Sequence, residues 1–108
     1  MTKTYQDFPI YKGNDVDIVV NTYNSDGSPL DVAGATITWV LRSEPGATPV
    51  LTKTVGSGIV IGTNSFTVTL TAAETAALTL SSYFHSATAV LSGKTKTLLT
   101  GNVTVLAP

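Results

Sequence analysis

The segment from Asp26 to Leu41 constrains the fold of this chain more than any other. It opens with two turn-forming pairs, Asp26-Gly27 and Ser28-Pro29, because glycine tolerates positive φ and proline fixes φ. From residue 35 onward apolar and polar side chains alternate, which is the period of a half-buried strand. The face that we expect to be buried carries Ile37, Trp39 and Leu41. Because Trp39 is the only tryptophan and the largest apolar side chain, we expect the core to form around it.

Shorter segments with strand-forming patterns recur along the chain, separated by residues typical of turns. They cover residues 8–11, 16–23, 50–55, 59–61, 65–70, 82–91 and 94–106. In the segment 82–91 one face carries Tyr83, His85, Ala87 and Ala89. We expect a bulge at Gly101 in the last segment. Turns at intervals of roughly 8–12 residues predict an all-β, two-sheet antiparallel sandwich of about seven strands.

One helix is predicted, over about residues 71–79, as a crossover between the two sheets. Thr71 and Glu74 have the spacing of a capping box, in which each side chain binds a backbone N–H of the other residue. The alanines around Glu74 favour a helix, but a helix of two turns needs support from the sheets. The sequence therefore predicts one domain over residues 8–108, preceded by a flexible N-terminal arm over residues 1–7.

Few side chains are charged, and hydroxyl groups take their place. Charged residues make up 12% of the chain, against about 25% in ordinary globular domains. Nineteen threonines and nine serines fill polar positions, which suits the solvent-facing side of strands. The net charge is −1 and no basic stripe occurs, so we expect no nucleic-acid partner.

Several site types are excluded by what the sequence lacks, and the missing segments bear on where the protein is made. The absence of cysteine excludes disulfides, thiol catalysis and zinc-thiolate sites. No apolar run approaches the ~20 residues of a membrane helix, so we expect no membrane association. The N-terminal residues do not contain the apolar stretch of a signal peptide. We therefore expect a protein that is made and folded in a cytoplasm.

Catalytic motifs are poorly represented. His85 is the only histidine, and without a partner for a metal or a triad it is best interpreted as a packed histidine with hydrogen-bonded nitrogens. Glu44 and Glu74 are assigned to a loop and to helix capping, which leaves no carboxylate pair for a glycosidase. Gly56-Ser57-Gly58 lacks the lysine and the helix of a phosphate loop. We therefore expect no enzyme activity and no cofactor.

Oxygen-bearing side chains gather around the segment 16–23 and could hold calcium, most closely near Asp15, Asp17 and Asp26. Their spacing matches no calcium loop, and aspartate and asparagine are common turn residues, so we expect no metal. The full set is Asn14, Asp15, Asp17, Asn24, Asp26 and Asp31.

Four aromatic residues near the N-terminus are candidates for partner binding: Tyr5, Phe8, Tyr11 and Tyr23. They either form an exposed patch for a protein or a sugar, or cap the open end of the sandwich. The sequence leaves both interpretations open, because only a contiguous patch indicates an interface.

A series of short motifs, in order and over nearly the whole chain, resembles a known family. The motifs occupy residues 11–20, 26–39, 66–78, 83–85, 92–94 and 99–105. They are similar to the small immunoglobulin-like domains of tailed-bacteriophage virions, of the kind found at the N-terminus of siphophage baseplate upper proteins. The resemblance implies an immunoglobulin-like sandwich that attaches a fibre, a receptor-binding protein or a decoration to a phage particle. It carries over no catalytic residue.

The resemblance also implies partners and a location. We expect the chain to bind copies of itself and phage capsid, tail or baseplate proteins within the virion. Longer members continue into a fibre or receptor-binding region, whereas this chain ends at Pro108, which favours a capsid decoration, cement or tail-accessory role. The alternative is a bacterial cell-surface or carbohydrate-binding adhesion module of the same fold, with a glycan as partner. The missing signal sequence and the single-domain length favour the virion protein.

Overall fold

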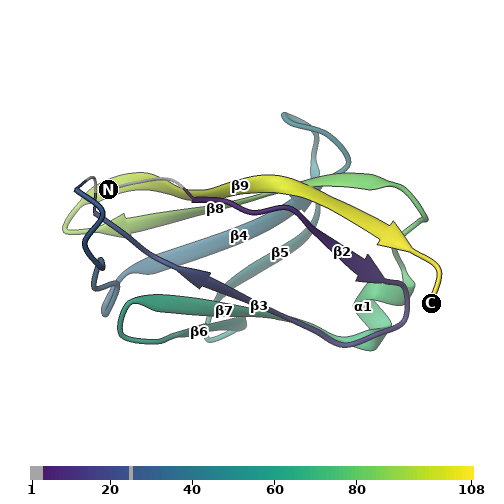
Figure 1. The fold of residues 1–108 in the computed structure, drawn as a ribbon, viewed down its shortest axis with the longest axis horizontal. Helices are drawn as coiled ribbons and strands as arrows, with labels where there is room; N and C mark the ends of the chain where they lie inside the picture. The colour runs from purple at the N-terminus through teal and green to yellow at the C-terminus, as the bar shows by residue number, and fades with distance from the viewer. Residues whose placement is uncertain (1–3, 25) are drawn as a thin grey trace.

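The computed structural model describes residues 4–24 and 26–108, with the backbone alone for residues 4 and 5. Nine strands and one short helix occupy most of this part of the chain (Figure 1). In chain order the elements are β1 (Thr4–Tyr5), β2 (Phe8–Tyr11), β3 (Val16–Asn21), β4 (Thr36–Arg42), β5 (Pro49–Val55), β6 (Gly58–Ile61), β7 (Ser65–Leu70), α1 (Ala72–Ala76), β8 (Ser82–Leu91) and β9 (Lys94–Leu106).

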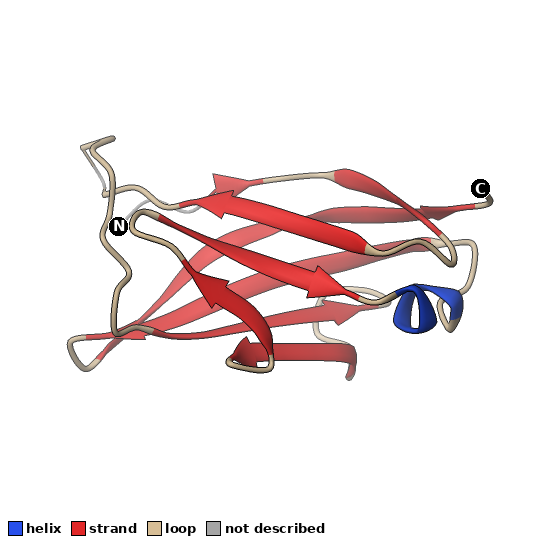
Figure 2. Cartoon of the chain, turned by 90° about the horizontal axis from the view of Figure 1, so that it is seen from below, coloured by secondary structure: helices blue, strands red, loops and turns tan. Residues whose placement is uncertain are grey.

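All nine strands belong to one hydrogen-bonded sheet in the order β1-β9-β8-β4-β5-β6-β7-β3, with β2 also paired to β9. The strands β1 and β2 run parallel to β9, and β5 meets β6 in parallel over two residue pairs. The remaining pairs are antiparallel. The sheet curls over on itself, so that β9, β8 and β4 lie on one side and β7, β6 and β3 on the other (Figures 1 and 2). It nearly closes into a barrel.

The prediction of two separate sheets needs correction at β5 and β6. The all-β class is confirmed, but Thr54 pairs with Gly58 and Val55 with Ile59, which joins the two sides of the fold into one continuous sheet. Gly56 and Gly58 both have positive φ, 84° and 102°, a conformation that glycine adopts without steric cost. These two glycines let the chain turn back beside itself instead of crossing between separate sheets.

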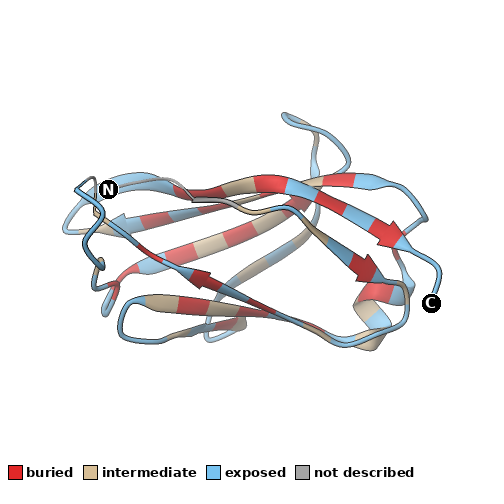
Figure 3. Ribbon diagram, in the orientation of Figure 1, coloured by how far each residue is buried: buried red, intermediate tan, exposed pale blue. Residues whose placement is uncertain are grey.

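The core lies between the two sides of the curled sheet, and Trp39 is at its centre. The predicted inward face of β4 is confirmed, since Ile37, Trp39 and Leu41 are all 0% exposed. Buried and exposed residues alternate along the strands in the same way (Figure 3). The predicted inward face of β8 is buried as well, from Tyr83 to Ala89. Strand period in the sequence therefore identified the core.

Two local predictions differ from the structure. The helix α1 spans five residues rather than 71–79, because the N–H groups of Ala77 and Leu78 bond to carbonyls only three residues back, which ends the helix. The bulge of β9 is at Leu98 and not at Gly101, since Ala87 pairs with Leu99 while Thr88 pairs with Thr97. Among the described residues, no helix has the length and apolarity to cross a membrane.

The segment predicted as a flexible arm contributes to the sheet where it is described. β1 aligns Thr4 with Leu99, and the Gln6 N–H donates to the Thr100 carbonyl at 3.0 Å. Residues 1–3 lie outside the described part of the chain. Residues 4–11 thus run along one edge of β9 as two short parallel strands.

Candidate interaction surfaces

His85 is fully buried on β8, and both of its ring nitrogens have partners. Its Nδ1 accepts a hydrogen bond from the Trp39 indole Nε1–H at 3.1 Å. Its Nε2 lies 2.6 Å from the Gln6 carbonyl oxygen, which can only accept, so Nε2 carries the proton. The partners therefore specify one neutral tautomer. The interpretation of His85 as a packed, hydrogen-bonded histidine is confirmed.

The surroundings of His85 favour its neutral form. The Phe8 ring meets it edge-on, with ring centroids 5.0 Å apart, and Trp39 packs against it with centroids 6.0 Å apart. Burial lowers the pKa of His85 below its ordinary value of 6.5, while the hydrogen bond to Gln6 and the negative charge of Asp7 act in the opposite direction. With both nitrogens engaged, His85 acts as a connector between strands.

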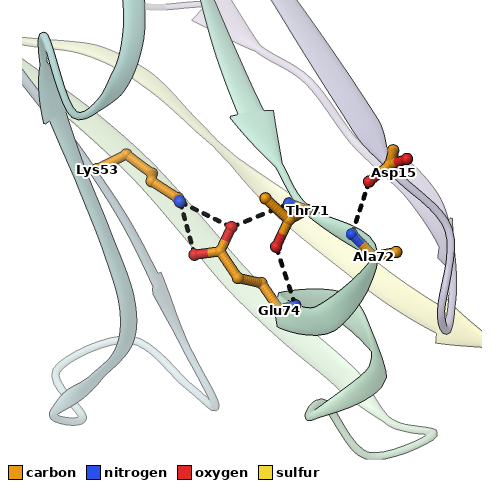
Figure 4. Close-up of polar contacts among 5 residues, drawn as sticks. All are labelled: Asp15, Lys53, Thr71, Ala72 and Glu74. Carbon is orange, nitrogen blue, oxygen red and sulfur yellow. Dashed lines mark hydrogen bonds and ion pairs between the residues drawn. The ribbon is translucent and has the colours of Figure 1, made fainter.

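A second polar cluster fixes the start of α1 (Figure 4). The predicted capping box is confirmed: the Glu74 N–H donates to the Thr71 hydroxyl at 3.2 Å, and the Thr71 N–H donates to Glu74 Oε1 at 2.9 Å. Lys53 of β5 forms an ion pair with Glu74 at 2.6 Å. Asp15 accepts from the Ala72 N–H at 2.7 Å. The pKa of Glu74 is lowered chiefly by the hydrogen bond from Lys53.

An open, mostly apolar hollow of about 410 Å³ lies beside this cluster, between β5, α1 and the start of β8. The only charged group of its lining is Glu74, which is already paired with Lys53. The hollow is suited to an apolar side chain and offers no nucleophile next to a base. Its lining residues are Val50, Leu51, Ala73, Glu74, Ala77, Leu78 and Tyr83.

The oxygen-bearing residues considered for calcium are not brought together. Within the described ranges, no three acidic or histidine side chains form a group that could hold a metal. Each of these carboxylates instead has its own hydrogen-bond partner: Asp17 accepts from the Thr69 hydroxyl of β7, Asp31 from the Ala33 N–H, and Asp26 from the N–H and hydroxyl of Ser28. The bonds from Ser28 lower the pKa of Asp26. The Asn14 carbonyl accepts a hydrogen bond from the Thr75 hydroxyl of α1 at 2.8 Å, and the Asn24 side-chain amide donates to the Pro29 carbonyl at 3.2 Å.

The four aromatic candidates occupy different environments. Phe8 packs against His85, whereas Tyr11 and Tyr23 are 46% and 39% exposed. Tyr11 ends β2 beside Leu106, and Tyr23 follows the far end of β3, so the length of that strand separates the two. The side chain of Tyr5 lies outside the described residues. The structure does not join Tyr11 and Tyr23 in one patch.

The outer face of the β5-β4-β8-β9 side carries a row of threonines that sequence reasoning did not identify. Thr38 is the register partner of Thr54 on one side and of Thr88 on the other. Thr88 in turn pairs with Thr97 of β9. The sequence contains a hint of this row, since three of these strands have two threonines with one residue between them. The strand register is needed to show that threonines of neighbouring strands lie side by side. The row forms an uncharged, hydroxyl-covered strip across four strands.

The comparisons with known proteins do not assign a family. The chain matches no protein-family model, and no curated protein matches it. What can be said of function therefore comes from the residues themselves, the fold and the resemblance described above.

Proposed function

We propose that this chain is a non-enzymatic structural module of a tailed-bacteriophage virion. It acts through protein–protein contacts, as a capsid decoration or cement protein or as a tail or baseplate accessory, and binds copies of itself and a neighbouring virion protein. The observation that carries the proposal is the run of motifs around Asp26–Trp39 and Phe66–Leu78, which resembles virion immunoglobulin-like domains in sequence order.

Two packing features support the immunoglobulin-like part of the proposal. Trp39 is buried on β4 at the centre of the core, as the tryptophan of the third main strand is in such domains. The Tyr83 hydroxyl, at the start of β8, accepts a hydrogen bond from the Thr79 N–H at 3.0 Å, four residues upstream. This contact has the form of a tyrosine corner, a feature of the same class. The continuous corner at β5 and β6 is a departure from two separate sheets.

The surface also fits a role in assembly. The threonine row from Thr54 to Thr97 presents hydroxyl groups without charge, which suits close packing against another protein more than attraction of a charged ligand. The strands β2 and β3 lie at the open ends of the sheet and leave backbone groups available for strand addition.

Mass spectrometry and cryo-electron microscopy of purified virions, from a phage that encodes this chain, test the proposal. We expect its peptides at a stoichiometric ratio to the major capsid or tail protein, and density for a small β-domain at symmetric positions. A virion preparation that lacks the chain contradicts the proposal. Specific binding of the isolated protein to a glycan array, with the chain absent from virions, would instead support the adhesion module.

A further inference from the structure

The N-terminal segment is attached to the rest of the fold at a buried point between β1 and β2. Within the described part of the chain, both strands pair with β9 alone. Between them the Gln6 carbonyl points inward and receives the His85 Nε2–H at 2.6 Å. A side chain at Gly101 would collide with the Gln6 carbonyl and would lie 2.8 Å from His85 Nε2, so glycine is required for this approach. His85 thus holds residues 4–11 from the core side of the sheet.

This contact tolerates only a neutral histidine. Nδ1 must accept from the Trp39 indole N–H, a group that can donate but not accept. A proton on Nδ1 would set two N–H groups against each other and place a positive charge in a site that is 0% exposed. The closed arrangement therefore has to open around His85 before it can take up a proton.

Among the described residues, one charged group acts on this site. The Asp7 carboxylate favours the protonated histidine and is itself held on β9 by the Asn102 N–H at 2.7 Å. The other neighbours carry no charge: Trp39 on β4, Phe8 on β2 and Gly101 on β9. The field of Asp7 is too weak to offset burial, since the pKa of His85 is lowered overall.

We propose that His85 is an acid-sensitive latch whose protonation releases β1 and β2 from β9. The N-terminal segment is the part that leaves, because β8 is paired on both sides, whereas β1 and β2 have β9 as their single partner among the described strands. Release uncovers an edge of the thirteen-residue strand β9, whose backbone groups then become available to another strand. The latch is closed above pH 6.5, the ordinary pKa of histidine, and opens progressively as the pH falls below it.

Hydrogen exchange of the full chain at pH 7.5 and pH 5.0, corrected for intrinsic rates, tests the latch. We expect faster exchange in residues 4–11 and in the β9 amides that face them, by up to about tenfold for each pH unit below 6.5 until the segment is mostly open. β3 and β7 keep their protection. The variant His85→Gln supplies an amide N–H for Gln6 and a carbonyl for Trp39 without titrating, and it removes the pH dependence. An equal acid response in His85→Gln, or a uniform rise in all strands of the native chain, overturns the proposal.

Asp7→Asn provides an independent variant that leaves His85 in place. The asparagine carbonyl still accepts from the Asn102 N–H, but the negative charge that favours protonated His85 is removed. Asp7 faces His85 only while residues 4–11 are in place, so its charge eases protonation in the closed state and not in the open one. We therefore expect acid to open residues 4–11 in this variant at least as readily, with the midpoint at the same or a higher pH. A midpoint that moves to lower pH contradicts the proposal, and this test holds even if His85→Gln does not fold.

Discussion

Two polar clusters join distant parts of this chain, and they differ in their access to water. In the first, His85 links Trp39 of β4 to Gln6 of the N-terminal segment, and the histidine is 0% exposed. In the second, Glu74 links Lys53 of β5 to the start of α1, and the two side chains are 27% and 13% exposed. Both clusters connect residues far apart in the sequence through a single central side chain.

Because the two clusters differ in burial, similar hydrogen bonds contribute different amounts to the stability of the fold. A donor or acceptor left unpaired in a dry site costs about 1–3 kcal/mol, because no water replaces the lost partner. An ion pair near solvent contributes about 0.2–1 kcal/mol, since water and salt compete for both charges. We therefore expect the histidine cluster to hold the fold together, while the glutamate cluster mainly stabilises one helix end.

Trp39→Ala should have the largest effect, because it removes both the centre of the core and the partner of His85 Nδ1. We expect a loss of about 3–5 kcal/mol in the free energy of unfolding, measured by chemical denaturation. A loss below about 1 kcal/mol would mean that Trp39 is not a core residue.

Gly101→Ala tests the other end of the histidine cluster. The new methyl group meets the Gln6 carbonyl, so the N-terminal segment must move away from β9. We expect a loss of about 1–3 kcal/mol in the same denaturation experiment. Asn102→Ala is the matched control, because its side chain faces solvent on the same strand and should change stability by less than about 0.5 kcal/mol. Equal effects of the two substitutions would contradict the close approach at Gly101.

Thr71→Ala removes the hydroxyl that accepts the Glu74 N–H at the start of α1. We expect a loss of about 1 kcal/mol in the free energy of unfolding. Thr71→Ser retains the hydroxyl and should leave stability within about 0.5 kcal/mol of the native value. If the serine variant is as unstable as the alanine variant, capping is not the role of Thr71.

Glu74→Gln should have the smallest effect, about 0.5 kcal/mol, because the amide oxygen still caps the Thr71 N–H while the charge facing Lys53 is lost. The pKa of Glu74 is lowered in the folded state, so its contribution is present above pH 4.5 and is lost as the pH falls below that value. Unfolding curves from pH 7.5 to 3 should therefore differ between the two chains above pH 4.5 and converge below it. A difference that grows toward acid pH would contradict this assignment.

The sequence predicted the second cluster better than the first, because the capping box is local. Thr71 and Glu74 are three residues apart and sufficed to predict α1, although not its early end at Ala76. His85 lies 46 residues from Trp39 and 79 from Gln6, so periodicity predicted its burial but not its partners.

The register between neighbouring strands could not be predicted from the sequence either. The sequence predicts two separate strand segments, 50–55 and 59–61, with a turn between them, but it does not predict that Thr54 pairs with Gly58 and makes the sheet continuous there. The same applies to the bulge at Leu98 and to the threonine row, which depend on how one strand aligns with the next. Alternation within a strand shows which face is buried, but it contains no information about the neighbour of each residue.

A pair of double-mutant cycles tests most directly whether burial makes the contact between Trp39 and His85 stronger than the contact between Lys53 and Glu74. One cycle combines Trp39→Phe with His85→Leu, and the other combines Lys53→Met with Glu74→Gln. The coupling free energy should be about 1–3 kcal/mol for the buried pair, because each single change leaves the other member of the pair without its hydrogen-bond partner in a dry site. It should be about 0.2–1 kcal/mol for the partly exposed pair of Lys53 and Glu74. A coupling at Lys53 and Glu74 that equals or exceeds the coupling at Trp39 and His85 would contradict the account.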